Sequence, residues 1–272
     1  LGANTFSSLI YSITAQGTNV YAAGEIGGVG AYWKNGTSIT PNEPTGSSSS
    51  GPSSHIMAIV LNGSDLYTAG FSDRYATCWK NGTMLPLQTL GSNAEAYGIA
   101  INGNDVYVAG YSGVNDTYSR ATNRKNGIPT LLTPSNSVAV AEAVAVSGTD
   151  VYVVGYTVGS DNKPIATYWK NGVTKVLGGS SSEALNVVVN GTDVYISGFL
   201  TSGAVYWKND VVTNLSSNPG TYIVSPVVFK GNDIYVAGYN DNGPIYWKNG
   251  VAVQLPKIDN VSYVASSAIV VR

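Results

Sequence analysis

Short runs of apolar residues, separated by polar turns, extend along the whole chain. Examples are residues 98–101 (Gly-Ile-Ala-Ile) and 186–189 (Asn-Val-Val-Val), and Val, Ile, Thr, Tyr and Trp fill most of the other runs. No stretch keeps the helical period of about 3.6 residues, whereas strand-sized runs bounded by Gly, Asn and Asp are typical of β-structure. The pattern therefore predicts an all-β protein.

Two motifs recur six times in the same order. The first reads Val-Tyr-x-Ala-Gly in its commonest form, with its tyrosine at Tyr21, Tyr67, Tyr107, Tyr152, Tyr195 and Tyr235. The second reads Tyr-Trp-Lys-Asn-Gly, with its lysine at Lys34, Lys80, Lys125, Lys170, Lys208 and Lys248. Successive copies lie 38 to 46 residues apart, a period that indicates a repeat architecture. One apolar run precedes each first motif and another follows each second motif, which makes four strand-sized segments per repeat.

The turns between these segments favour hairpins. Gly-x-Asp sequences such as 63–65 join the first segment to the second, because Gly allows a positive φ. Asn-Gly, the strongest short hairpin signal, joins the third to the fourth. Each repeat is thus a four-stranded antiparallel meander, and six such sheets are stable when packed radially in a six-bladed β-propeller. We expect residues 1–272 to form it as a single domain; a β-solenoid usually has a shorter coil, and a sandwich does not repeat its turns six times.

One strand carries a resemblance to a known family. Residues 151–157 (Val-Tyr-Val-Val-Gly-Tyr-Thr) resemble the Val-Tyr-x-x-Gly-Tyr-Thr strand of bacterial SBBP-type propeller repeats. The likeness covers one strand per repeat and lacks that family's later motifs. It implies the propeller fold and no activity. The Gly-His and Trp-Asp marks of WD40 repeats and the double Gly of kelch repeats are absent.

The pattern of the first segment occurs seven times, because residues 262–272 match residues 9–15. Six closed blades need six copies. Either one terminal strand closes the ring while the other adds at an edge, or the chain was cut from a longer array. The chain begins with Leu1 and not Met, so we expect a mature or trimmed product.

A tryptophan recurs in the third segment of five repeats. These residues are Trp33, Trp79, Trp169, Trp207 and Trp247. A residue that is repeated in this way is most simply a packing residue, so we predict that Trp169 and Trp207 are buried between blades. The alternative is a ring of sugar-stacking aromatic residues. Cys78, in the tyrosine position of repeat two, is expected to be a buried, inert thiol.

The variable loops of the meander gather on one side. These are the loops between second and third strands and between blades, whereas the tight turns lie on the other side. Binding residues concentrate on variable loops that a rigid scaffold holds. The strongest departures from the repeat are residues 40–54 and 118–125, with the loop at 72–75 between them. We therefore predict a ligand-binding patch over blades one to three, with Arg74, Tyr75, Tyr118 and Arg120 as contacts.

Two further residues are candidates for ligand contact. Arg124 stands where other repeats have Trp, and with Arg120 and Lys125 it forms a basic segment that could receive a carboxylate, sulfate or phosphate. The other interpretation is a decayed blade whose arginine lies along the surface. His55 stands at the position of Glu95 and Glu183, where these residues could line the rim of a central channel. A lone histidine without partners is the simpler interpretation.

Composition excludes several classes of function. The net charge is −2 and the basic residues are scattered, so we expect no nucleic-acid partner. No apolar run is long enough for a membrane span. One cysteine and one histidine argue against a disulfide and a zinc site, and we expect no cofactor, although oxygen atoms of residues 161–162 and 240–242 could help to hold Ca²⁺.

Enzyme chemistry has little support in the sequence. The aspartates at the tight turns are explained by bonds to their own backbone. Asp116, Asp161 and Asp241 lie in variable loops and leave paired-carboxylate glycoside chemistry open. The leading hypothesis is a bacterial, secreted or surface-attached, non-catalytic propeller that binds a glycan or another extracellular ligand through its variable face. The alternative is a scaffold for protein–protein interaction, and a glycosidase or lyase comes third.

Overall fold

The fold is the predicted six-bladed β-propeller. The computed structural model describes residues 8–42, 54–88, 90, 91, 93–113, 118–223 and 225–256, and these residues form six antiparallel sheets and no helix. The chain divides into two compact units, Leu1–Leu131 and Leu132–Arg272, with three blades each. The proposed terminal strand at 262–272, most of the 40–54 connection and Asp116 lie outside the described residues.

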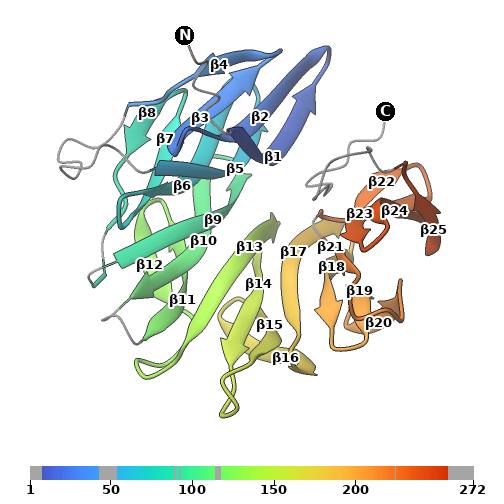
Figure 1. Cartoon of the computed structure of the whole chain (residues 1–272). Helices are drawn as coiled ribbons and strands as arrows, with labels where there is room; N and C mark the ends of the chain where they lie inside the picture. The colour runs from blue at the N-terminus through green and yellow to red at the C-terminus, as the bar shows by residue number, and fades with distance from the viewer. Residues whose placement is uncertain are drawn as a thin grey trace, which may run out of the picture. The chain divides into compact units, whose positions relative to one another are not determined.

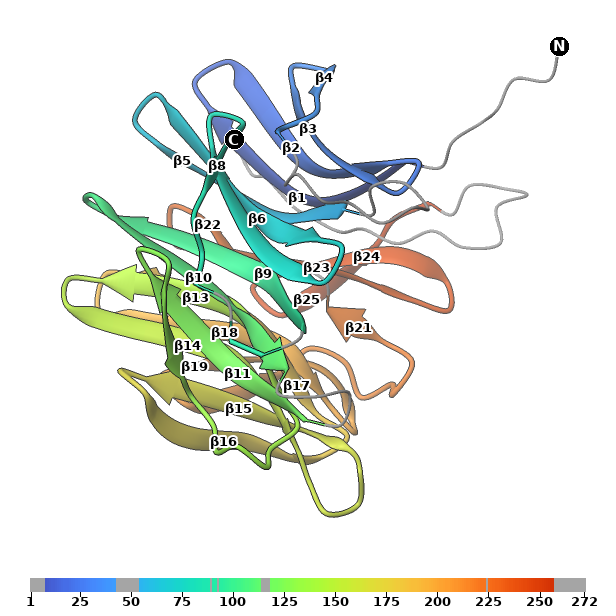
Figure 2. The same cartoon turned by 90° about the vertical axis from the view of Figure 1, so that its left-hand side faces the viewer.

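In blades one to five the strands follow one another in chain order, as the meander requires (Figure 1). The strands of the first unit are β1 (Ser8–Gln16), β2 (Asn19–Ile26), β3 (Val29–Lys34) and β4 (Thr37–Ile39) in blade one, β5 (Ser54–Asn62), β6 (Asp65–Ser72), β7 (Tyr75–Lys80) and β8 (Thr83–Leu85) in blade two, and β9 (Asn93–Asn102), β10 (Asp105–Gly113), β11 (Ser119–Lys125) and β12 (Ile128–Leu131) in blade three. Strand β5 contacts both β1 and β9, so the sheet of blade two lies between its neighbours (Figure 2).

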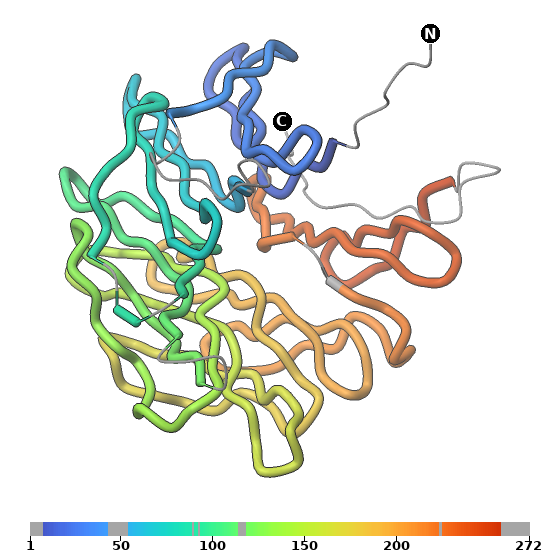
Figure 3. Tube along the Cα trace, turned by 60° about the vertical axis from the view of Figure 1, so that its left-hand side comes forward, coloured from blue at the N-terminus to red at the C-terminus, as the bar shows by residue number. Residues whose placement is uncertain are grey.

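The second unit repeats this arrangement from yellow to red in the chain trace (Figure 3). Its strands are β13 (Ala139–Ser147), β14 (Asp150–Val158), β15 (Pro164–Lys170) and β16 (Val173–Ser180) in blade four, β17 (Glu183–Asn190), β18 (Asp193–Leu200), β19 (Gly203–Lys208) and β20 (Val211–Asn214) in blade five, and β21 (Tyr222–Ile223), β22 (Val228–Lys230), β23 (Asp233–Asn240), β24 (Gly243–Lys248) and β25 (Val251–Gln254) in blade six.

Blade six departs from the predicted four strands, because β21 and β22 divide its first strand. Between them, Pro226 has no N–H to donate to a strand ladder. The Ser225 hydroxyl takes a ladder position instead and accepts a hydrogen bond from the Ala237 N–H at 2.8 Å.

The repeated aspartates bind the neighbouring hairpin as well as shaping their own turn. In blade two, Asp65 accepts hydrogen bonds from the Lys80 ammonium at 2.7 Å and the Asn81 amide at 2.9 Å. Lys80 also lies 5.4 Å from the centroid of the Tyr67 ring. Blades three to six repeat the Asp–Lys pair at 2.7–2.8 Å. The prediction that these aspartates bind only their own backbone was therefore incomplete.

The glycine that ends the first motif is required by a bulge in the strand beside it. In blade two the register between β5 and β6 slips between Ile56 and Ala58, which leaves Met57 as an extra, unpaired residue. A Cβ on Gly70, opposite this bulge, would lie 1.8 Å from the His55 carbonyl oxygen. The equivalent glycines of blades one, three, four and five face the same carbonyl at 1.8–2.1 Å, and a bulge lies beside each. The motif glycine therefore makes room for the bulge.

Four of the repeated tryptophans are buried in the core. Trp79, Trp169, Trp207 and Trp247 are at most 2% exposed. The prediction that Trp169 and Trp207 are buried is confirmed, and a ring of exposed stacking residues is ruled out at these four positions. Cys78 is also fully buried, and burial raises the pKa of its thiol to about 12, so it is the inert thiol that was expected.

Candidate ligand-binding site

The predicted contacts from blades two and three lie at the variable-loop end of the first unit. Arg74 lies in the turn between β6 and β7, and Tyr75 begins β7. Tyr118 directly precedes β11, and Arg120 lies at its start. Tyr75 and Tyr118 are 51% and 37% exposed. A ligand can therefore reach aromatic surface on both blades.

Backbone pairing brings the two arginines to the same end. The Ala94 N–H of β9 donates to the Arg74 carbonyl at 2.7 Å, which ties the loop of blade two to blade three. Ala94 pairs with Ser112 of β10, and Ser112 pairs with Arg120 of β11. Arg74 and Arg120, 46 positions apart in the chain, are thus linked by one hydrogen bond and two strand pairings.

A carboxylate flanked by two tyrosines lies beside this row. Glu95, which follows Ala94, accepts hydrogen bonds from the Tyr97 hydroxyl at 2.5 Å and the Tyr111 hydroxyl at 2.9 Å. Tyr97 is the bulge residue of β9, and Tyr111 pairs with Glu95 across the ladder. All three side chains are partly exposed. The bulge therefore aims a tyrosine at the carboxylate and holds the group in a fixed position.

His55 belongs to a similar cluster between blades one and two. Its imidazole Nδ1 pairs with the Glu25 carboxylate, which also accepts a hydrogen bond from the Tyr11 hydroxyl at 3.2 Å. The ring of His55 lies 4.7 Å from that of Phe71, its ladder partner. Burial, reinforced by the charge of Glu25, raises the pKa of Tyr11 to about 12, so the phenol remains protonated. The interpretation of His55 as a histidine without partners is therefore wrong.

Arg124 lies beneath the surface and not along it. Its side chain is fully buried in the position that tryptophan takes in other blades, so the surface-lying arginine is also a wrong interpretation. One Nη donates to the Ser112 hydroxyl at 2.9 Å, whereas Nε and the other Nη have no partner among the described residues. Burial lowers the pKa of the guanidinium to about 10. A ligand on the surface would meet Arg120 first.

The second unit places different residues at the equivalent positions. Glu142 is the bulge residue of β13, and Glu183 pairs with Phe199 as His55 pairs with Phe71. Burial raises the pKa of Glu183. Burial and, to a smaller extent, the negative charges of Glu142 and Glu183 raise the pKa of Tyr156 to about 12. The common frame thus carries a different set of side chains in each blade.

Sequence reasoning missed Tyr11, Tyr97 and Tyr111 as members of these clusters. The glycine of the first motif was placed in a strand, but no bulge was predicted beside it. A glycine repeated inside a strand often marks a bulge, and a bulge re-aims side chains. That glycine was the signal that could have directed attention to the bulge residues.

Within the part of the chain that the structure describes, no three His, Cys, Asp or Glu residues are grouped so that they could hold a metal ion. In the same residues no helix has the length and apolar character needed to cross a membrane.

Comparison with known proteins supports the fold and goes no further. No protein-family model and no curated protein matches the chain, so the likeness to SBBP-type repeats is not confirmed. Among solved structures, the chain is similar to the extracellular domain of the putative one-component system BT4673 from B. thetaiotaomicron, with a TM-score of 0.59, 12% identity and 97% of this chain aligned to 35% of that one. It also matches the computationally designed Ika8 protein at a TM-score of 0.46, with 15% identity over 92% of this chain and 87% of that one.

Proposed function

We propose that this protein is a secreted or surface-attached, non-catalytic propeller that binds a glycan through the variable-loop end of blades one to three. The observation that carries the proposal is the backbone pairing that brings Arg74 and Arg120 to the same end of blades two and three, where Tyr75 and Tyr118 are exposed. Tyrosine offers rigid apolar surface for the C–H face of a sugar, whereas arginine and carboxylate bind its hydroxyl groups by directed, charge-assisted hydrogen bonds.

A binding role suits the carboxylates better than a catalytic one. Glu25 is paired with His55 and Tyr11, and Glu95 accepts bonds from two tyrosines. These partners already occupy oxygen atoms of both carboxylates, whereas glycoside cleavage needs a carboxyl oxygen that faces the scissile bond. The similarity to an extracellular domain of a one-component system supports an extracellular location.

The first test is a glycan array, followed by calorimetric titration of the glycans that bind. Arg74→Ala, Tyr75→Ala, Tyr118→Ala and Arg120→Ala should each weaken binding by about tenfold. Ser202→Ala and Asn242→Ala are the matched controls, because they change the corresponding loops of blades five and six and should leave the affinity unchanged.

Two results would overturn the proposal. Equal losses in all six variants would replace the single patch by a multivalent arrangement with one weak site per blade. An array without any bound glycan would favour the protein-interaction scaffold instead.

A further inference from the structure

A cleft between blades four and five is lined by both polar and apolar side chains. It has a volume of about 650 Å³, within the range of sites that hold small molecules. One side comes from β14, β15 and the start of β16, and the other from the β17–β18 and β19–β20 turns. All of these elements belong to the second unit, and the lining includes the Lys-Asn turns, so the cleft lies at the opposite end of the blades from the variable loops.

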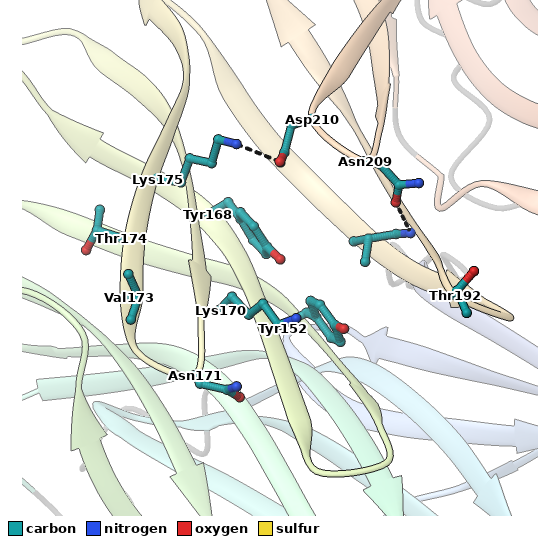
Figure 4. A pocket seen from close by; sticks show the side chains of 11 residues that line it. Tyr152, Tyr168, Lys170, Asn171, Val173, Thr174, Lys175, Thr192, Asn209 and Asp210 are labelled. Carbon is teal, nitrogen blue, oxygen red and sulfur yellow. Dashed lines mark hydrogen bonds and ion pairs between the residues drawn. The ribbon is translucent and has the colours of Figure 1, made fainter.

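Tyr168 of β15 lies at the centre of the cleft (Figure 4). Its ring is stacked parallel to that of Tyr152, with 6.3 Å between the centroids and 4° between the planes. The Tyr152 hydroxyl donates to Asp150 at 3.2 Å, but no described residue accepts a hydrogen bond from the hydroxyl of Tyr168. Burial and, to a smaller extent, the negative charge of Asp210 raise the pKa of Tyr168 to about 12. The group is thus a neutral phenol that can donate a hydrogen bond to a ligand.

Asp210 closes one edge of the cleft in a strained conformation. It has a φ of 71°, directly after Asn209 at 48°, and the corresponding residue of the other five blades is glycine. A side chain in the left-handed region costs free energy, and such costs are concentrated at functional sites. The carboxylate of Asp210 pairs with Lys175 of the neighbouring blade at 2.6 Å, across the mouth of the cleft (Figure 4).

The lining selects the chemical class of a ligand. Both lysines in the cleft are already paired, Lys170 with Asp150 at 2.7 Å and Lys175 with Asp210. A charged ligand would have to separate one of these pairs. A hydroxyl group can instead bridge the pair intact, since it donates to a carboxylate and accepts from an ammonium. The amides of Asn171 and Asn209 are bound within their own blades. The other polar groups of the lining are the hydroxyls of Tyr152, Tyr168, Thr174 and Thr192, with Val173 and Val194 as apolar surface.

We infer that this cleft is a second binding site, one that takes a neutral, hydroxyl-rich ligand of the size of a mono- or disaccharide. The inference does not rest on the function proposed for the variable-loop end, because it uses other residues on another end of the blades. The phenol of Tyr168 binds one hydroxyl of the ligand, the Lys175–Asp210 pair binds a second, and the valines contact the C–H surface.

The test is a titration of the whole chain with glucose, galactose, cellobiose and maltose as neutral probes, and glucuronate as the charged probe. Binding is followed by saturation-transfer NMR. Tyr168→Phe removes only the hydroxyl, and Asp210→Gly restores the turn of the other blades, so both variants should fold. Each should weaken binding of the neutral probe by about 3- to 10-fold, which corresponds to the loss of one hydrogen bond.

The controls separate this cleft from the rest of the molecule. Tyr32→Phe removes the equivalent hydroxyl from blade one, where the tyrosine is buried to the same extent, and should leave the affinity unchanged. Tyr75→Ala, at the variable-loop end, should also have no effect on binding in the cleft. The inference is overturned if no neutral probe binds, if glucuronate binds more tightly than every neutral probe, or if Tyr168→Phe and Asp210→Gly both bind like wild type.

Discussion

The cleft between blades four and five has an equivalent between blades two and three, and the two differ in size and chemistry. The second one has a volume of about 220 Å³ and is lined mainly by Cys78, Leu85, Pro86, Leu87 and Val106. Cys78 stands in the position of Tyr168, and Gly127 in the position of Asp210. The same place in the repeat is therefore an open polar cleft in one unit and a small apolar cavity in the other.

The path of the chain after the fourth strand explains the difference. In blade two, β8 ends at Leu85 and the chain crosses the turn of blade three, where the Gln88 N–H donates to the Gly127 carbonyl at 2.9 Å. In blade four, β16 continues as one strand to Ser180, so its chain stays with its own sheet. A cleft thus arises where the outer strand is extended, and the repeated motifs themselves do not determine it.

The packing beneath the two clefts also differs at one position. Trp207 packs with Tyr152 and Tyr168 under the larger cleft, whereas blade three has the buried Arg124 at the same place. We expect Trp207→Ala to lower the free energy of unfolding by about 3–5 kcal/mol, because it leaves a cavity that the sheets cannot close. Urea denaturation measures the loss. A variant as stable as wild type would show that the blades can collapse around the missing ring.

Exchange of the two turn residues tests the role of the chain path. A Cβ on Gly127 would lie 2.4 Å from the Pro86 carbonyl oxygen, and φ is 82° there. Gly127→Asp should therefore lower the free energy of unfolding by about 2–3 kcal/mol, from overpacking and backbone strain together. Gly172→Asp is the matched control, since its φ is also 82° but no atom lies within 4 Å of its Cβ position. Equal losses of stability in both variants would show that the contact with the crossing chain contributes nothing to the effect of Gly127→Asp.

Arg124→Trp would give blade three the residue of the other blades. A buried guanidinium with two unpaired nitrogen atoms is costly, and its replacement by an apolar side chain should raise the free energy of unfolding by about 1–3 kcal/mol. Thermal and urea denaturation measure the change. A clear loss of stability would show that the arginine fits this interface better than the tryptophan does.

Asp210→Gly should also raise the free energy of unfolding, but by less than Arg124→Trp does. It removes a side chain from the left-handed region and restores the Asn-Gly turn, at the cost of an exposed ion pair that contributes little. We expect a gain of about 1 kcal/mol in the free energy of unfolding. Lys175→Met, which removes the ion pair and leaves the strain, is the control and should be nearly neutral. A less stable Asp210→Gly variant would show that the pair outweighs the strain.

The aspartates of the tight turns occur beside both clefts and should give the smallest effect. The hydrogen bond from the neighbouring lysine lowers the pKa of Asp105 and Asp193 below the ordinary value. A carboxyl whose pKa is lower in the folded state stabilises the fold above its unfolded pKa, near 4, and loses this contribution as the pH falls through the folded value. The melting temperature should therefore decrease below about pH 4, and Asp193→Asn should reduce that decrease. If the melting temperature of the variant decreased with pH as steeply as that of wild type, Asp193 would be excluded as a source of the decrease.

The sequence by itself determined the all-β class, the meander of each blade and the buried tryptophans. These features depend on local signals, namely apolar runs, Asn-Gly turns and an aromatic residue at a fixed place, and each signal occurs in five or six of the repeats. The accessibility of Tyr75 also followed from its place next to a variable loop. Blade six shows the limit, because its first strand is divided into β21 and β22, with Pro226 between them, where the repeat predicted one strand.

Only the tertiary structure decided which side chains meet. Glu95 finds Tyr111 through the strand register and Tyr97 through a bulge, and neither is visible in the spacing of the motifs. Tyr168 and Asp210 meet at one cleft because β16 is long and stays with its sheet. Contacts of this kind depend on how far an outer strand runs and on which neighbouring blade it faces, and these are properties of packing between repeats that no single repeat contains.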